Sequence, residues 1–236
     1  MALAARAYES TGMNSQVIQL LLFAGPAIVA ITLHEASHGY AAFALGDDTA
    51  KRAGRISLNP IRHIDPFGTI LLPALLALTV GTVFGYAKPV PVDFHRLRHP
   101  RRDMALVAAA GPLTNVALAL VFAVLFFFLL GPADNNPILW NVMVMSIQLN
   151  FVLAILNLLP LPPLDGSKVV ASFLPEAILE PYLRLEAFGF LILIGLLIVV
   201  PYVTGMMGEP VDIIWWLVAA PAYELTSGIM ELIGAL

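Results

Sequence analysis

The sequence predicts an all-α protein that crosses a membrane several times, and three observations support this class. Of its 236 residues, 59% are hydrophobic and only 12% are charged, whereas soluble domains carry about 25% charged residues. The mean hydropathy is +0.87. The apolar residues form long runs with almost no charge, which is typical of membrane-spanning helices: 17–33, 67–84, 104–130, 138–160, 186–203 and 211–223.

We expect five of these runs to form full transmembrane helices. The first covers about 17–45, the next two cover 104–130 and 138–160, and the last two form a C-terminal pair within about 184–236. Positively charged loops tend to stay in the cytoplasm. With five spans, this rule places the N-terminus outside and the C-terminus inside.

The run 67–84 is predicted to enter the membrane and return. Basic loops at 46–66 and 85–103 flank it, and both should be cytoplasmic. The run has only about 18 residues and contains Pro73 and Gly81. We therefore expect a short re-entrant segment, with a full tilted crossing as the alternative.

Two short segments between the helices, 54–60 and 85–93, are predicted to be extended. They contain β-branched residues and are bounded by Gly and Pro, as edge strands often are. We expect them to form a small membrane-associated β-hairpin, whose edge can pair with an extended peptide.

The end of the first apolar run carries a pattern of metal-binding chemistry. The chain has no cysteine, so a metal must be held by histidine and carboxylate side chains. The sequence reads His34-Glu35-Ala36-Ser37-His38, and a spacing of four places two imidazoles on one helix face, where they suit zinc. Glu35 can take a proton from a water at the metal without binding the metal itself. Because these polar groups are costly beside so apolar a run, we favour a functional role over a structural one.

Two histidines leave a zinc site incomplete, and Asp165 stands out as the third ligand. It follows the apolar run 138–160 and the proline-rich break 160–163, where a helix cannot continue. Gly166 then permits a tight turn beside the carboxylate. The alternatives are a helix-capping role for Asp165, or a ligand from the basic loops: His63, Asp65, His95 or His99.

Taken together, the motifs His34–His38 (HEASH), 110–115 (AGPLTN) and 157–166 (NLLPLPPLDG) resemble the site-2 protease family of intramembrane zinc peptidases. The early loop 63–69 (HIDPFGT) resembles a small bacterial and archaeal branch. The chain contains no stretch that would form the inserted peptide-binding domain of larger members.

The resemblance implies one Zn²⁺ per chain, with His34, His38 and Asp165 as its ligands and Glu35 as the catalytic general base. Asn157 is expected to position the substrate backbone or stabilise the oxyanion.

Asn115 is expected to have the same role as Asn157, and a structural bond to a neighbouring helix is an equal alternative. For His63 and Asp65 we expect hydrogen bonds that order their loop.

The implied activity is hydrolysis of a peptide bond within or near a transmembrane segment. The expected partners are a substrate helix and the lipid bilayer, with no nucleic acid and with the oligomeric state left open. We expect a multi-pass protein of a prokaryotic plasma membrane, with its active site towards the cytoplasm. The whole chain, 1–236, is interpreted as one domain, with a catalytic core at about 17–175 and the C-terminal helix pair beyond it.

The alternative function is a membrane metal-ion transporter that uses the same cluster as a transit site. Such transporters often contain internal repeats with interrupted helices in matching places. The second half of the sequence shows no second cluster of this type, so we favour the peptidase.

Overall fold

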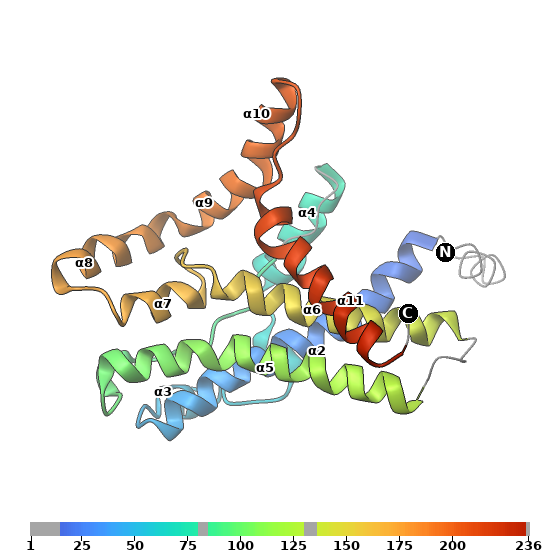
Figure 1. Cartoon of the computed structure of the whole chain (residues 1–236). Helices are drawn as coiled ribbons and strands as arrows, with labels where there is room; N and C mark the ends of the chain where they lie inside the picture. The colour runs from blue at the N-terminus through green and yellow to red at the C-terminus, as the bar shows by residue number, and fades with distance from the viewer. Residues whose placement is uncertain (1–14, 80–84, 130–135, 235–236) are drawn as a thin grey trace.

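Three long helices form the centre of the molecule. The computed structural model describes residues 15–79, 85–129 and 136–234. Helices α2 (Ser15–Ala44), α5 (Pro100–Leu129) and α6 (Pro137–Leu158) pack against one another, and α11 (Ala220–Leu232) crosses α6 (Figure 1).

Short helices complete the fold around these three. Helix α3 (Thr49–Arg52) follows α2, and α7 (Asp165–Ala171) packs on α5. A bent helical arm then leads away from the bundle (Figure 1). It consists of α8 (Glu176–Arg184), a 3₁₀ turn at Leu185–Phe188, α9 (Gly189–Ile194), a π-helical turn at Gly195–Val199 and α10 (Val200–Met206).

The main apolar core lies where α5, α6 and α11 meet. Phe126 of α5 and Ile147 of α6 are almost completely buried there. The small residues Ala119, Ala123 and Ala222 let the three backbones approach closely. This packing fixes how α5 and α6 face each other farther along the bundle.

Three helices among the described residues are long and apolar enough to cross a membrane: Pro100–Leu129, Ile138–Leu158 and Glu176–Met206. The predicted number of five full spans is therefore wrong. One reason is that the last apolar run, 211–223, forms a π-helical turn (Trp215–Ala219) that leads into α11, and this helix is not among the three. Helix α2 has 30 residues, and its side chains are described from Leu22 onward.

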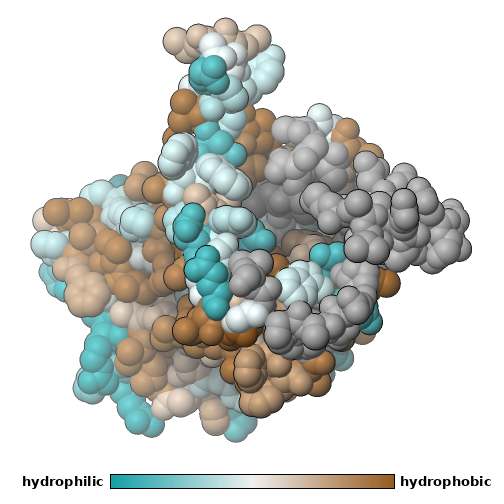
Figure 2. Space-filling view, turned by 45° about the vertical axis from the view of Figure 1, so that its right-hand side comes forward, coloured by the Kyte–Doolittle hydropathy of each residue, from teal (hydrophilic) through white to brown (hydrophobic). Residues whose placement is uncertain are grey.

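The outer surface of the bundle is apolar. Large hydrophobic side chains of α5 point outward, and Phe128 is 77% exposed. Figure 2 shows hydrophobic residues over broad parts of the visible face. Soluble monomers rarely expose apolar patches of this extent, and the surface is consistent with an integral membrane protein.

The described flanks of the segment predicted to be re-entrant lie next to each other. The segment begins as a π-helical turn (Pro66–Leu71) that continues into α4 (Leu72–Thr79). After it, the N–H of Tyr86 donates to the carbonyl of Gly68 at 3.0 Å, and the Thr69 hydroxyl donates to the carbonyl of Tyr86 at 2.9 Å. The two flanks therefore lie side by side, whereas a full crossing would separate them by about 30 Å.

The segments predicted as strands, 54–60 and 85–93, form no β-ladder, and no strand occurs within the described parts of the chain. The prediction of a β-hairpin is therefore wrong. The second segment is extended, but its two prolines have no N–H to donate. The N–H of Val90 donates instead to Glu35 Oε2 at 2.9 Å, and that of Lys88 donates to the carbonyl of His63 at 2.9 Å, so these N–H groups are satisfied without strand pairing.

A hydrogen bond to Asp47 connects the C-terminal end of this extended segment to the end of α2. The Asp47 carboxylate is fully buried and accepts bonds from the N–H and hydroxyl of Thr49 and from the N–H of Asp93. Although burial raises the pKa of Asp47, the bonds from Thr49 and Asp93 outweigh it and hold the pKa below its usual range. The extended segment is thus fixed across the second half of α2.

Candidate active site

Helix α2 presents two buried histidines to α5. His34 and His38 are 7% and 8% exposed. Because they lie one helical turn apart, their rings meet edge to face, with Nε2 atoms 3.1 Å from each other.

The third group comes from the start of α7. Asp165 is the first residue of that helix, and the preceding residue Leu164 provides no side-chain cap. Asp165 Oδ2 lies 3.1 Å from His34 Nε2 and 3.3 Å from His38 Nε2. The helix-capping alternative for Asp165 therefore finds no support, because the carboxylate faces the two histidines.

Gly166 makes this approach possible. A Cβ at this position would collide with the backbone carbonyl of Leu158, the last residue of α6. Only glycine allows the chain to fold back so tightly after the proline-rich break.

The arrangement of these three ligand atoms fits zinc. The edges of their triangle measure 3.1, 3.1 and 3.3 Å. In a tetrahedral site with bonds of 2.0–2.1 Å, two ligand atoms lie about 3.3 Å apart. Two imidazoles and one carboxylate also leave a fourth position open, as catalytic zinc sites require.

Hydrogen bonds on the far side of each ring orient the two histidines. His34 Nδ1 lies 2.5 Å from Asn115 Oδ1, and His38 Nδ1 lies 2.8 Å from the carbonyl oxygen of Val107. Both oxygens accept, so each Nδ1 carries the proton and each Nε2 directs its lone pair towards Asp165. Partners of this kind are a regular feature of histidine metal ligands.

The structure thus places Asn115 behind His34, on the side away from Asp165. The Asn115 side chain is fully buried between helices and lines neither of the two cavities that lie beside the site. A direct contact with substrate, one of the roles predicted for Asn115, has no support from this position.

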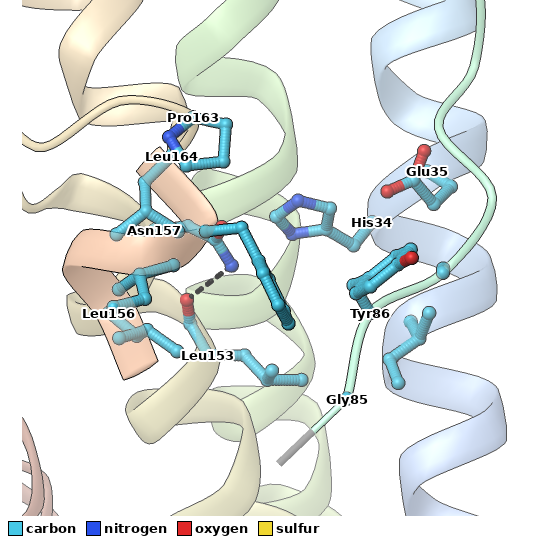
Figure 3. A pocket seen from close by; sticks show the side chains of 13 residues that line it. His34, Glu35, Gly85, Tyr86, Leu153, Leu156, Asn157, Pro163 and Leu164 are labelled. Atoms are coloured by element: carbon cyan, nitrogen blue, oxygen red, sulfur yellow. Dashed lines mark hydrogen bonds between the residues drawn. The ribbon is translucent and has the colours of Figure 1, made fainter. Parts of the chain in front are cut away.

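Two open cavities meet at the site and form a groove, which we call the active-site groove. Their volumes are about 330 and 490 Å³, and His34, Glu35 and Asn157 line both. Figure 3 shows α2 with His34 and Glu35 on one side and α6 with Asn157 on the other. One end is apolar and includes Leu193, and the other includes the charged residues Lys168 and Glu186.

Glu35 and Asn157 face the groove with defined partners. Glu35 Oε2 accepts the N–H of Val90, so the extended segment holds the carboxylate in the cavity that His34 and His38 also line. Asn157 Nδ2 donates to the carbonyl of Leu153 at 2.9 Å, one turn earlier in α6 (Figure 3). An amide nitrogen carries two N–H donors, so Asn157 has a second one for a ligand.

Among the described residues, the group that could hold a metal does not include His63 or Asp65. His63 Nε2 contacts the carbonyl of Ser57 at 2.8 Å, and Asp65 Oδ1 accepts the N–H groups of Phe67 and Gly68. These are hydrogen bonds within the loop, of the kind expected for both residues.

Gly111, part of the motif 110–115, lies directly against the imidazoles of His34 and His38. A Cβ on Gly111 would lie 2.5 Å from His38 Nε2 and 2.6 Å from His34 Nε2. The absent side chain therefore creates the space in which the metal would lie. A glycine following three alanines in the middle of an apolar run was the available signal.

We expect Gly111→Ala to abolish zinc binding while the protein stays folded. The methyl group enters the space between the two imidazoles, whereas alanine favours the helix by about 1 kcal/mol. Zinc content measured after purification, together with the thermal unfolding midpoint, tests this expectation. The matched control is Gly228→Ala in α11, where an added Cβ meets no atom within 4 Å. Normal zinc content in Gly111→Ala would contradict the geometry.

Comparisons with known proteins show the family of the chain. The sequence profile of Peptidase family M50 matches residues 131–201, which include Asp165. A Bacillus subtilis protein named "Putative zinc metalloprotease YwhC" is 40% identical over 176 residues, which cover 72% of this chain and 77% of that protein. The chain belongs to peptidase family M50. The predicted site-2 protease membership is thereby confirmed.

Other proteins named as putative zinc metalloproteases also match. "Putative zinc metalloprotease Rip2" of Mycolicibacterium smegmatis is 28% identical over 171 residues, covering 72% of this chain and 64% of that protein. Rip2 of Mycobacterium tuberculosis is 30% identical over 181 residues, covering 74% of this chain and 64% of that protein. No solved structure matches the chain significantly.

Membership of family M50 makes this protein a zinc metalloprotease. The zinc cofactor and the enzyme class predicted from the sequence are confirmed, and the transporter alternative is not favoured. His34, His38 and Asp165 form the group that can hold the ion.

Proposed function

We propose that this protein hydrolyses a peptide bond within or near a transmembrane segment of a membrane-protein substrate. The observation that carries the proposal is the position of the metal-binding group. It lies between α2 and the apolar helix α5, which is long enough to span a membrane, and it opens into a groove. A site in this place meets peptide bonds that are themselves in the membrane.

The proposed roles follow from the contacts of each side chain. His34, His38 and Asp165 would hold zinc, which when bound polarises a carbonyl and acidifies water. Glu35 takes a proton from the attacking water and passes it to the leaving nitrogen. Asn157 offers its second N–H to the carbonyl oxygen of the substrate, where negative charge develops.

The active-site groove is suited to an unwound stretch of substrate. A membrane helix has all its amides bonded internally, so it must open locally before a peptide bond can be attacked. The apolar end of the groove offers contacts for the part of the substrate that stays in lipid. The end with Lys168 and Glu186 offers contacts for polar flanking residues.

We further propose the orientation in the membrane and the division of the chain. The basic loops 46–66 and 85–103 adjoin the site, which favours the cytoplasmic side of a prokaryotic plasma membrane. Residues 17–175 form the catalytic core and 184–236 a C-terminal unit of the same domain.

The test uses purified protein reconstituted in lipid vesicles with a panel of single-span membrane peptides. We expect cleavage within the apolar part of at least one peptide, loss of cleavage after treatment with a chelator, and recovery when zinc is returned. Zinc flux across the vesicles without cleavage of any peptide would contradict the proposal and support the transporter alternative.

A further inference from the structure

Two asparagines form a buried pair between the three central helices. Asn115 of α5 and Asn150 of α6 are both fully buried. Asn150 lines neither cavity of the active-site groove, so it does not contact substrate there. Burying a polar amide in an apolar interior costs free energy unless its hydrogen bonds are satisfied.

The donor and the acceptor of each hydrogen bond of this pair are determined by its neighbours. Asn150 Nδ2 donates to the carbonyl of Ser146 at 2.8 Å, one turn earlier in α6. Asn150 Oδ1 therefore faces Asn115 and accepts from its Nδ2 at 2.9 Å. Asn115 Oδ1 in turn faces His34 Nδ1 at 2.5 Å. Because the Ser146 carbonyl can only accept, it determines the direction of every bond in this series.

We infer that Asn150 is a positioning residue for the metal ligand His34, to which it is connected only through Asn115. The series of bonds keeps the proton of His34 on Nδ1 and leaves the lone pair on Nε2, where zinc would bind. If Asn115 turned its amide over, its N–H group would face His34 Nδ1 and favour the other tautomer. That tautomer would direct an N–H towards the metal.

Asn150 is the main group that prevents this rotation of Asn115. The other acceptor near Asn115 Nδ2 is the carbonyl of Ala30, at the longer distance of 3.4 Å. The inference rests on the zinc site of the proposed function, but not on cleavage of a membrane substrate.

The test measures zinc affinity by competition with a chelator, in detergent and without substrate. We expect Asn150→Leu, which keeps the volume but loses the acceptor, to weaken zinc binding about tenfold, the low end of the range for groups behind a metal ligand. If Asn150→Leu does not fold, Asn150→Ala serves the same purpose. Asn150→Asp should keep normal affinity, because its neutral acid can still donate to Ser146 and accept from Asn115.

The matched control is Ser146→Ala. The Ser146 hydroxyl is equally buried and bonds the carbonyl of Val142 in its own helix, so its loss should leave zinc affinity unchanged. A double-mutant cycle separates positioning from general packing. In an Asn115→Leu background, Asn150→Leu should have no further effect on zinc affinity.

Two results would overturn the inference: equal zinc affinities for Asn150→Leu and Ser146→Ala, or additive effects in the double mutant. Failure of the wild type to cleave any peptide would refute the proposed function, and these zinc measurements would still decide the role of Asn150.

Discussion

Replacing Glu35 by Gln should reduce peptide hydrolysis by about 10²–10⁴-fold, the usual contribution of a general base, while zinc stays bound. The two side chains have nearly the same shape, and the amide oxygen of Gln can still accept the N–H of Val90 that holds Glu35 Oε2 at 2.9 Å. What Gln lacks is the ability to take a proton from water. Glu35 is not part of the metal-binding group, so its replacement should remove proton transfer and leave zinc binding intact.

The measurements for Glu35→Gln are zinc content and initial cleavage rate of a membrane peptide in vesicles. Glu180→Gln is a suitable control, because Glu180 is an exposed residue of α8 paired with Arg184. This control should cleave at the wild-type rate. Cleavage by Glu35→Gln at the wild-type rate would refute the assignment of Glu35 as the base.

Replacing Asp165 by Ala should weaken zinc binding by more than about 100-fold, beyond the usual loss for groups behind a metal ligand. Asp165 Oδ2 lies within 3.1 and 3.3 Å of the two histidine nitrogens and is the only carboxylate in the described metal-binding group. Without it, two neutral imidazoles remain, and no thiolate exists anywhere in the chain to replace the lost donor.

Zinc affinity of Asp165→Ala is best compared with that of Asp48→Ala. Asp48 forms surface ion pairs with Arg52 and Arg96, and its loss should leave the zinc affinity unchanged. If Asp165→Ala retained wild-type affinity, the third ligand would have to be another residue. Equal losses in both variants would indicate a general effect on folding.

The sequence alone was sufficient for the parts of the site that depend on local geometry. A separation of four residues puts His34 and His38 on one face of any helix, and the structure brings their Nε2 atoms together. The proline-rich break before Asp165 likewise predicts that the chain must leave the helix there. Family membership and the zinc cofactor followed from these motifs.

Other features depended on which groups meet after the chain folds. The segment 85–93 has the composition of an edge strand, yet its N–H groups find separate acceptors. Those of Val90 and Asp93 bond the carboxylates of Glu35 and Asp47, and that of Tyr86 bonds the carbonyl of Gly68. No local pattern shows where a backbone N–H will find its acceptor. For the same reason, the predicted β-hairpin did not form.

Local hydropathy also could not determine the number of membrane spans. An apolar run shows that a segment avoids water, but not whether it crosses the membrane or returns. For the run 67–84, the structure adds that Gly68 and Tyr86, near its two ends, are joined by a hydrogen bond.

The metal-binding residues themselves were thus determined by the sequence, through helix periodicity and the chemistry of their side chains. Their surroundings were decided only by the tertiary structure. The space left by Gly111 and the bonds from His34 through Asn115 to Asn150 exist because α2, α5 and α6 approach closely. That approach depends on packing among residues more than thirty positions apart, which no short motif contains.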